Sequence, residues 1–423
     1  MIIYSKKKPK IKKIKAKEIL DSRGDPTLEV EVETNFGNFS SSVPSGASKG
    51  KYEALELRNG EKRYFGKGVL KAVEKVEKII SKKLKGENPI NQKRIDQILI
   101  ELDGTKNKSK LGGNSICGVS LACCRAGAGA KKIPLYLHIA QLIEAQPQSV
   151  KLPRPAFNII NGGLHAGNDL DFQEFMVCPK KRSFSQNLRM GVEIYHQLKK
   201  ILEKKYGKSA INVGDEGGFA PPIKFPQEAI ELILKASKAL NYEREISIFL
   251  DVASSQFFKN EKYQTKFGKF EGKKLAKYYL KLIRKYPLES IEDPFGEDDF
   301  ESWSFFKKMT KIQILGDDLL ATNLQRIKIA KEKNLCNAIL IKINQVGTVS
   351  EALEAVNLAK SFNWKIMVSH RSGETTDDFS ADFAVGVLAD FVKFGAPARG
   401  ERIVKYNRLL KIESEVENLR SKK

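Results

Sequence analysis

Short apolar runs, each followed by a longer stretch with helical periodicity, repeat through the second part of the chain. The runs occupy residues 246–250, 288–291, 312–315, 338–343, 364–368 and, more briefly, 390–394. Strand-like runs that alternate with helical stretches are typical of βα units, and the strands of such units pair in parallel. The sequence therefore predicts an α/β fold in which parallel strands close into a barrel inside a shell of helices.

Each of these runs ends on or near a polar side chain. The side chains are those of Asp251, Glu292, Asp317, Lys342, His370 and Lys393. Most successive members are about 25 residues apart, which is roughly one strand, one helix and their loops. Because the C-terminal ends of the strands in a parallel barrel face one mouth, we expect these side chains to converge on one site. One or two polar strand ends are unremarkable, but six in register favour a shared function.

A different pattern precedes this repeat. Residues 11–39 alternate apolar and polar side chains, most clearly at 27–33, which predicts antiparallel strands with a hairpin turn at 35–38. Helical periodicity follows over residues 68–139. We therefore expect three regions, namely a basic tail at 1–10, an α+β domain at 11–144 and the barrel domain at 150–423.

The cysteine content and the apolar segments of the chain indicate the cellular compartment of the protein. The chain has five cysteines, an odd number with no C-x-x-C pair, so neither a disulfide framework nor a structural zinc site is expected. No apolar run reaches the roughly 18 residues of a membrane span. The segment Met1 to Tyr4 is also too short for the apolar region of a signal peptide. These features predict a cytoplasmic protein, and a secondary location on the cell surface stays open.

The formal net charge of +23 is unusual, and its densest part is the lysine-rich run at residues 6–13. Such an excess of positive charge is compatible with binding to nucleic acid or to an anionic surface. It is also compatible with lysines spread over solvated helix faces. The latter interpretation is favoured, because no RNA-binding motif with interleaved aromatic residues accompanies the charge.

The residue types at the strand ends indicate a chemistry. Asp251, Glu292 and Asp317 are hard oxygen ligands without Cys or His support, which favours Mg²⁺. Arg371 and Ser372 offer a planar fork and a hydroxyl group that fit a phosphate. A lysine that lies between cations and a metal ion loses its proton more easily, so Lys342 is a candidate general base whose product would be a metal-stabilised enolate.

Three glycine-rich loops carry further candidates. The turn at 212–219 contains Glu216, a candidate acid for a leaving hydroxyl group, although it could be a plain loop. The loop at 161–168 and the segment after it bring His165 and Glu174 toward the same mouth. The loop at 45–50 has glycines at which it could hinge over a site.

Short motifs distributed along nearly the whole chain resemble the enolase family. They include 22–26 (Ser-Arg-Gly-Asp-Pro), 44–48 (Pro-Ser-Gly-Ala-Ser), 214–218 (Gly-Asp-Glu-Gly-Gly), 291–294 (Ile-Glu-Asp-Pro), 316–319 (Gly-Asp-Asp-Leu), 341–345 (Ile-Lys-Ile-Asn-Gln) and 368–375 (Val-Ser-His-Arg-Ser-Gly-Glu-Thr). The resemblance implies an N-terminal α+β capping domain on a modified TIM-type (β/α)8 barrel that has an antiparallel strand near its start. It also implies reversible dehydration of 2-phosphoglycerate to phosphoenolpyruvate in glycolysis, by a homodimer or a ring of dimers.

The same resemblance assigns roles to residues of this chain. It implies that Lys342 removes the α-proton and that Glu216 protonates the leaving hydroxyl group, with His165 and Glu174 assisting. Two Mg²⁺ ions are implied, the first on Asp251, Glu292 and Asp317 and the second, substrate-dependent, on Ser48. The residues implied to contact the substrate are Ser48, His165, Gln173, Glu174, Glu292, Asp317, Lys342, Ser369, His370, Arg371, Ser372 and Lys393.

The chain departs from the family pattern at Lys49, Leu164, Gln256 and Phe394. These departures bear on rate and loop behaviour and leave the reaction type unchanged. A sugar-acid dehydratase or racemase of the same superfamily is an alternative, but those enzymes typically carry a Lys-x-Lys pair or a His–Asp pair, and no Lys-x-Lys stands at a strand end here. A protein that keeps the fold but only binds nucleic acid or a surface, through its basic tail, is the alternative outside enzymes.

Overall fold

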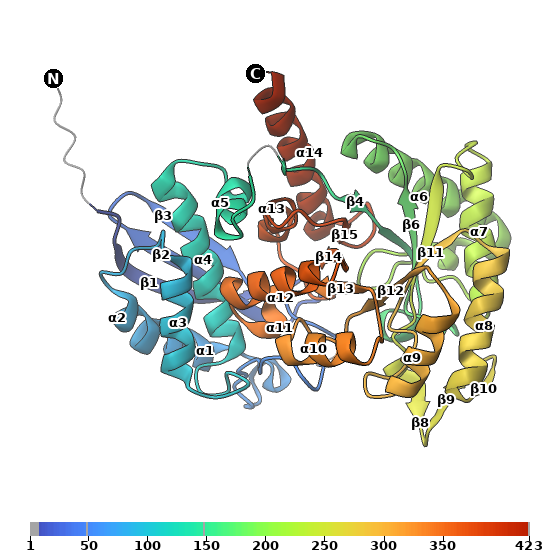
Figure 1. Cartoon of the computed structure of the whole chain (residues 1–423), viewed down its shortest axis with the longest axis horizontal. Helices are drawn as coiled ribbons and strands as arrows, with labels where there is room; N and C mark the ends of the chain where they lie inside the picture. The colour runs from blue at the N-terminus through green and yellow to red at the C-terminus, as the bar shows by residue number, and fades with distance from the viewer. Residues whose placement is uncertain (1–7, 48–49, 147–148, 422–423) are drawn as a thin grey trace.

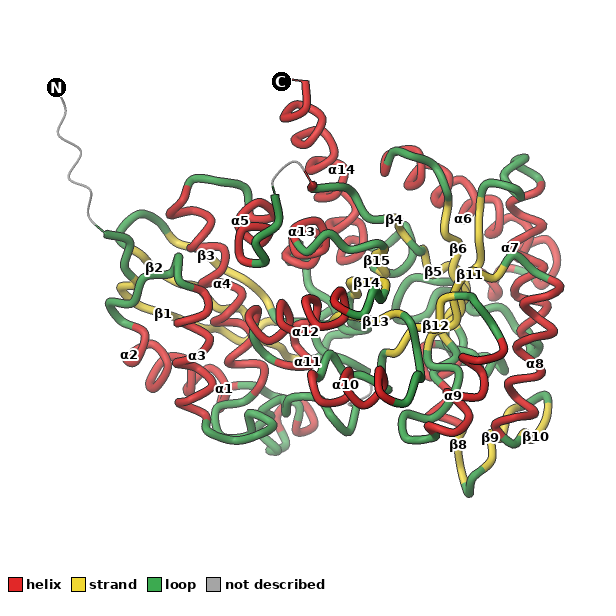
Figure 2. Tube along the Cα trace, viewed as in Figure 1, coloured by secondary structure: helices red, strands yellow, loops and turns green. Residues whose placement is uncertain are grey.

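The computed structural model describes residues 8–47, 50–146 and 149–421, and Figure 1 shows two parts lying side by side. The N-terminal part, in blue, is an antiparallel sheet with helices packed on it. The larger part, from green to red, is a ring of strands inside a layer of helices, which Figure 2 separates by colour. The predicted α/β barrel with an α+β part ahead of it is therefore confirmed. No helix in the described residues combines the length and hydropathy needed to cross a membrane.

Three antiparallel strands form the N-terminal sheet: β1 (Ile11–Leu20), β2 (Pro26–Thr34) and β3 (Asn38–Ser42). The alternation seen in the sequence decides which side chains face inward. Ile14 lies opposite Val32, and both are buried, whereas Lys17 and Glu29 form an ion pair on the other face. The buried face belongs to a hydrophobic cluster of its own, separate from the barrel.

The helices on this sheet are α1 (Leu70–Lys75), α2 (Ser81–Leu84), α3 (Gln92–Asp103), α4 (Gly113–Lys131) and α5 (Leu135–Leu142), and a π-helical turn at Val76–Ile80 joins α1 to α2. Small residues allow α4 to lie directly on the sheet. A Cβ atom at Gly118 would be 2.6 Å from Val30 Cγ2, and one at Gly129 would be 2.3 Å from the ring of Phe39. The small residues of α4 thus set the distance between helix and sheet.

The barrel strands are β4 (Arg154–Pro155), β5 (Phe157–Asn161), β6 (Glu174–Pro179), β7 (Ile246–Asp251), β11 (Leu288–Glu292), β12 (Gln313–Gly316), β13 (Ala338–Ile341), β14 (Lys365–Ser369) and β15 (Phe391–Lys393). Their order is β4-β15-β14-β13-β12-β11-β7-β6-β5. Only Ala156 separates β4 from β5, so the order starts and ends on one stretch of chain and the sheet closes. Apolar side chains such as Met176, Phe249 and Leu340 fill the interior.

One strand of the barrel runs against the others. β6 is antiparallel to both β5 and β7, whereas the remaining neighbours pair in parallel. The chain therefore enters β6 at the mouth, at Glu174, and leaves it at the opposite end. Two helices, α6 (Phe184–Tyr206) and α7 (Pro226–Lys238), pack together before the chain enters β7. Their connecting turn, which contains Glu216, consequently lies at the mouth.

The other helices of this part are α8 (Gly272–Lys285), α9 (Phe300–Met309), α10 (Leu324–Glu332), α11 (Ile343–Val346), α12 (Val349–Ser361), α13 (Phe379–Gly386) and α14 (Gly400–Ser421). Side chains satisfy the first amides of several of them. Ser183 accepts a hydrogen bond at the start of α6, Asp299 at α9 and Thr348 at α12. Such N-caps set the residue at which each helix begins.

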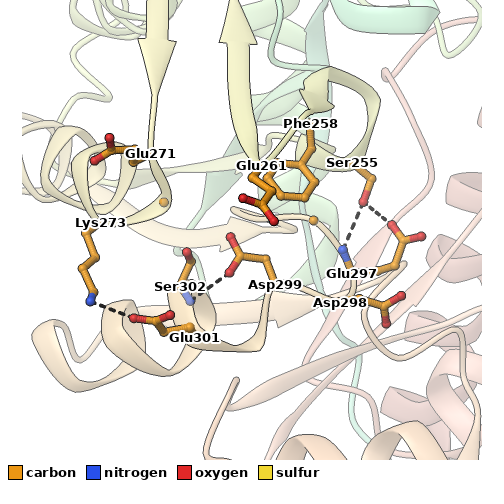
Figure 3. A pocket seen from close by; sticks show the side chains of 12 residues that line it. Ser255, Phe258, Glu261, Glu271, Lys273, Glu297, Asp298, Asp299, Glu301 and Ser302 are labelled. Carbon is orange, nitrogen blue, oxygen red and sulfur yellow. Dashed lines mark hydrogen bonds and ion pairs between the residues drawn. The ribbon is translucent and has the colours of Figure 1, made fainter.

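A small meander of β8 (Phe258–Lys259), β9 (Lys262–Thr265) and β10 (Gly268–Phe270) follows β7. It borders the open hollow of Figure 3, which is lined by several carboxylates. Many of these groups have partners inside the protein: Glu301 pairs with Lys273 at 2.7 Å, and Asp299 accepts a hydrogen bond from Tyr263 at 2.6 Å. Asp298, at the edge of the hollow, instead contacts the segment that follows β3.

The packing of α4 against α5 gives the first testable prediction. A Cβ atom at Gly127 would lie 2.7 Å from the carbonyl oxygen of Pro89 and 2.7 Å from His138 Nε2, and a backbone carbonyl cannot move aside easily. We expect Gly127→Ala to lower the free energy of unfolding by about 1–2 kcal/mol, because overpacking outweighs the better helix propensity of alanine. The matched control is Gly400→Ala, where nothing lies within 4 Å. Equal unfolding midpoints in urea for the two variants would contradict the expectation.

Candidate active site

The polar strand ends meet in one cavity at the barrel mouth. Its lining includes Asp251, Asp317, Lys342, His370 and Lys393, which are five of the six side chains that the strand-end pattern singled out. The sixth, Glu292, is bonded to Lys393 in the wall. Further lining residues come from loops and from the mouth ends of β6 and β14, and those relevant to the predictions are Gly46, Ala47, Glu53, His165, Gln173, Glu174, Glu216, Gln256, Ser369, Arg371 and Ser372. The strand-end side chains therefore converge at a single mouth.

Lys393 lies at the centre of the acidic side of this cavity. From the end of β15, its Nζ atom is 2.8 Å from Glu292 Oε1, 3.2 Å from Asp251 Oδ2 and 3.2 Å from Glu174 Oε1. The Lys393 side chain is only 2% exposed. Burial alone would lower the pKa of this ammonium group, but the three carboxylates raise it well above the usual value. Lys393 is thus a permanent cation that links the ends of three strands.

Lys342, the predicted base, is also paired. It stands at the N-cap position of α11, and its Nζ atom forms a short ion pair with Asp317 Oδ2. Burial alone would lower the pKa of Lys342, but the carboxylate of Asp317 outweighs it and raises the pKa. Arg371 and Lys393 act in the opposite direction and lower this pKa, with a weaker effect than that of Asp317.

Two carboxylates that the strand-end pattern missed lie beside Asp317. The possible ligand atoms of Asp293, Asp317 and Asp318 all lie within 4.8 Å of one another. Burial, with Asp317 close by, raises the pKa of Asp318 to about 7, and burial with Asp318 and Asp317 raises that of Asp293 well above its usual value. Each follows directly on a predicted residue, in Glu292-Asp293 and Asp317-Asp318, and these acidic pairs were the available signal.

Asp251, Glu292, Asp293, Asp317 and Asp318 together form an acidic wall, which fits a hard divalent cation. The oxygen atoms of Asp293 already accept hydrogen bonds from the amides of Asp317 and Asp318, at 2.9 and 2.7 Å, so Asp293 supports the turn rather than offering a free ligand. Asp251 lines the cavity, and both Asp251 and Glu292 contact Lys393. Burial and then Asp251 raise the pKa of Glu292 well above its usual value. Carboxylate oxygens without sulfur ligands suit Mg²⁺.

A second cluster adjoins this wall through Glu174, which also contacts Lys393. The ligand atoms of His165, Glu174 and Glu216 lie within 4.8 Å of one another. His165 Nδ1 is 3.5 Å from Glu216 Oε1, and Asn158 donates to Glu216 Oε2 at 2.9 Å. Burial, with Glu216 beside it, raises the pKa of Glu174 well above the usual value. For Glu216, burial acts in the same direction, but His165 and His370 lower its pKa below the usual value. Of the two carboxyl groups, Glu174 therefore keeps a proton more readily.

Arg402, buried in α14, fixes the protonation of His370. The guanidinium group lies 2.7 Å from His370 Nδ1, and because arginine only donates, Nδ1 must accept. A neutral His370 ring then carries its hydrogen on Nε2, which faces Glu216 Oε2 at 3.4 Å. Burial lowers the pKa of His370 to about 3. Arg402 also donates to the carbonyl oxygens of Arg371 and Asp215, at 2.7 and 3.0 Å, and so holds two mouth segments together. Nothing in the sequence pattern marked it.

The predicted phosphate-binding residues lie on the cationic side. The guanidinium group of Arg371 donates to Glu53 Oε2 at 2.8 Å and to Asn344 Oδ1 at 3.3 Å. Ser372 Oγ is 3.2 Å from His165 Nε2, which joins this side to the Glu216 cluster. Ser369 lines the cavity, although its hydroxyl group donates to the carbonyl oxygen of the next residue. Ser48 and Lys49, the predicted metal ligand and the departure beside it, lie outside the described residues.

The remaining departures have clear positions. Gln256 donates to Gln173 Oε1, while Gln173 donates to Asp251 Oδ2 at 3.3 Å, so Gln256 joins the network behind the acidic wall. Leu164 is 61% exposed in the loop before β6, and Phe394 is fully buried. Neither replaces a charged group of the cavity.

A closed α/β barrel whose mouth joins buried carboxylates to lysines and an arginine is typical of a barrel enzyme. Comparison with known proteins makes this specific. Residues 149–421 match the family described as enolase, C-terminal TIM barrel domain, and residues 11–139 match enolase, N-terminal domain. Enolase B of Dictyostelium discoideum is 52% identical over 428 aligned positions, which cover 97% of this chain and 96% of that protein. The chain belongs to the enolase family, whose members are lyases.

The Arg402–His370 contact generates a prediction. The folded-state pKa of about 3 lies below the ordinary value of 6.5, so protonation favours the unfolded chain. The contribution of neutral His370 to stability is therefore full above about pH 6.5 and is lost as the pH falls toward about 3. In ¹⁵N NMR spectra we expect the His370 ring to remain neutral at pH 5, with its hydrogen on Nε2, and His370→Gln identifies the signal. A ring that titrates near pH 6.5 would contradict this assignment.

Proposed function

We propose that this protein catalyses the reversible, Mg²⁺-dependent dehydration of 2-phosphoglycerate to phosphoenolpyruvate, the step that enolases contribute to glycolysis and gluconeogenesis. The observation that carries the proposal is the division of one buried cavity into two sides. Carboxylates of β7, β11 and the start of the β12–α10 turn face the cationic group of Lys342 and Arg371. A substrate with a carboxylate and a phosphate needs cationic side chains, and it needs carboxylates that can hold a metal ion.

The chain's own residues divide the proton transfers. Lys342, at the end of β13, is proposed to remove the α-proton, and it becomes a base when Asp317 is engaged elsewhere and no longer stabilises the ammonium form. Glu216, supported by Asn158 and by His370, is proposed to protonate the leaving hydroxyl group. Glu174, the neighbouring carboxyl group with the raised pKa, can supply that proton to Glu216.

The other groups bind and orient. Arg371 and Ser372 are proposed to hold the phosphate, and Lys393 the negative charge that develops on the substrate carboxylate. His165, Gln173, Ser369 and His370 line the space between. Asp251, Glu292 and Asp317 would hold the first Mg²⁺ and Ser48 the second. Magnesium, when bound, would stabilise the doubly charged enolate as a Lewis acid.

We further propose a cytoplasmic location, a homodimeric or higher assembly, and the domain limits 11–144 and 150–423. The idea that the tail binds nucleic acid or a surface depends on residues 1–10, most of which lie outside the described residues. No described contact favours it.

The dependence of activity on Mg²⁺ tests the proposed role of the acidic wall. Chelation with EDTA should abolish formation of phosphoenolpyruvate, and Mg²⁺ should restore it, because three carboxylates would otherwise repel the substrate. Asp317→Asn should raise the Mg²⁺ concentration needed for half-maximal rate by about tenfold or more. Glu261→Gln, in the hollow of Figure 3 and outside the cavity, is the control and should behave as wild type. Full activity in metal-free buffer would refute the metal assignment.

Isotope exchange separates the two proton transfers. Lys342→Ala should abolish exchange of the α-proton of 2-phosphoglycerate with solvent, because the base is lost. Glu216→Gln should slow dehydration by about 10²-fold or more yet leave exchange measurable, because the base survives. Exchange is followed by NMR in D₂O, beside phosphoenolpyruvate absorbance. If Glu216→Gln lost exchange while Lys342→Ala retained it, the two roles would be reversed.

A further inference from the structure

A short segment between β3 and α1 holds the N-terminal part against the barrel mouth on two sides. It begins where Ser45 pairs with Gly373, through hydrogen bonds of 2.8 and 2.9 Å, directly after Arg371 and Ser372. Farther along, the Tyr52 hydroxyl group donates to Asp298 at 2.9 Å, and the guanidinium group of Arg326 lies 4.2 Å from the centre of the Tyr52 ring. Tyr52 therefore anchors the outer side of the segment.

The next residue, Glu53, turns into the cavity. Its Oε2 atom accepts from Nη1 of Arg371 at 2.8 Å, and its Oε1 atom lies 3.3 Å from Nη2 of the same guanidinium group. The side chains of Arg371 and Glu53 are 5% and 9% exposed, so the ion pair is largely shielded from water. A carboxylate that engages both terminal nitrogens fixes the plane of a guanidinium group as well as its place.

Glu53 is also connected to the metal side of the cavity and to the loop above it. The amide of Gly50 donates to Glu53 Oε1 at 3.2 Å. Gln345 Nε2 lies 3.4 Å from that same oxygen and donates to Asp317 Oδ1 at 3.0 Å. The carboxylate of Glu53 thus contacts Gly50, the proposed phosphate ligand Arg371 and Gln345. Gln345 in turn is bonded to the proposed metal ligand Asp317.

We propose that Glu53 is a positioning residue for phosphate recognition: it orients the guanidinium group of Arg371 and ties that orientation to the segment between β3 and α1. The inference deepens the proposed function and rests on it. A long arginine side chain has many rotamers, and holding it in the binding orientation beforehand removes an entropic penalty from substrate binding. Without Glu53, Arg371 would keep its bond to Asn344 but would lose the partner that engages both terminal nitrogens.

The same contact allows an opposite interpretation. Glu53 could compete with the phosphate for Arg371, in which case its removal would strengthen phosphate binding. Geometry favours positioning, because Glu53 is held by Gly50 and Gln345 as well as by Arg371, and its main chain is fixed where Ala54 donates to the carbonyl oxygen of Gln345 at 2.7 Å. A competitor would need freedom to move away, and these contacts oppose it.

Inorganic phosphate and 2-phosphoglycerate are the probes. In the full-length protein with Mg²⁺, Glu53→Ala should raise both the KM for 2-phosphoglycerate and the dissociation constant of phosphate by about tenfold or more. The value of kcat should fall by less than about threefold, because no proton transfer passes through Glu53. Glu53→Gln keeps an acceptor oxygen and should lie between Glu53→Ala and wild type. It also serves as the test variant if Glu53→Ala fails to fold.

Two controls separate positioning from a general effect. Glu56→Gln removes a carboxylate from the same segment, but Glu56 pairs with Arg58 at 2.7 Å rather than with Arg371. Tyr52→Phe removes the anchor to Asp298 and leaves the ring on Arg326. Both should leave the dissociation constant of phosphate near that of wild type.

Three results would overturn the inference: phosphate binding unchanged in Glu53→Ala, phosphate binding strengthened, or an equal loss in Glu56→Gln. Phosphate binding, measured by calorimetry, does not depend on turnover. A wild-type protein that fails to convert 2-phosphoglycerate would therefore contradict the proposed function, whereas normal turnover with no effect of Glu53→Ala contradicts this inference alone.

Discussion

The site depends on the placement of one ammonium group inside the barrel. Lys393 comes from the last strand, β15, and reaches carboxylates at the mouth ends of β6, β7 and β11, none of which is paired with β15. A buried ion pair of this kind requires good geometry, because each charge has lost its water. The strand ends therefore cannot shift independently: a change of register in any of these strands would leave a buried carboxylate without its cation. Closure of the sheet and assembly of the mouth are the same structural event.

Charge also explains why the cavity holds its groups in pairs. Lys342 is paired with Asp317 and Arg371 with Glu53. Burial, together with neighbouring carboxylates, raises the pKa values of Asp318 and Glu292. In the proposed function, metal and substrate would redistribute partners that are already within hydrogen-bond distance. Little movement of the barrel itself is required, since its interior is a closely packed core.

The sequence alone predicted the barrel and its strand-end residues, because hydrophobic periodicity and position along the chain determine them. It could not find residues whose importance arises from tertiary contact. Arg402 lies in a helix at the end of the chain and acts on His370 through space. Glu53 lies in a loop with no periodic pattern. The pKa of Lys342 is raised because a single carboxylate at bonding distance outweighs the neighbouring cations. Pair distances of this kind have no counterpart in spacing along a chain.

The reversed strand β6 has a consequence for how such a site can diversify. Because β6 carries the chain away from the mouth, two helices are needed to bring it back to the start of β7, and the turn between them delivers Glu216. The proposed proton donor is thus carried by a connection between two helices, while the proposed base is carried by the barrel frame. Connections of this type tolerate changes of length and sequence that a strand cannot. Descendants of such a scaffold could exchange the acid, and with it the leaving group expelled, while inheriting the base and the metal-binding wall unchanged.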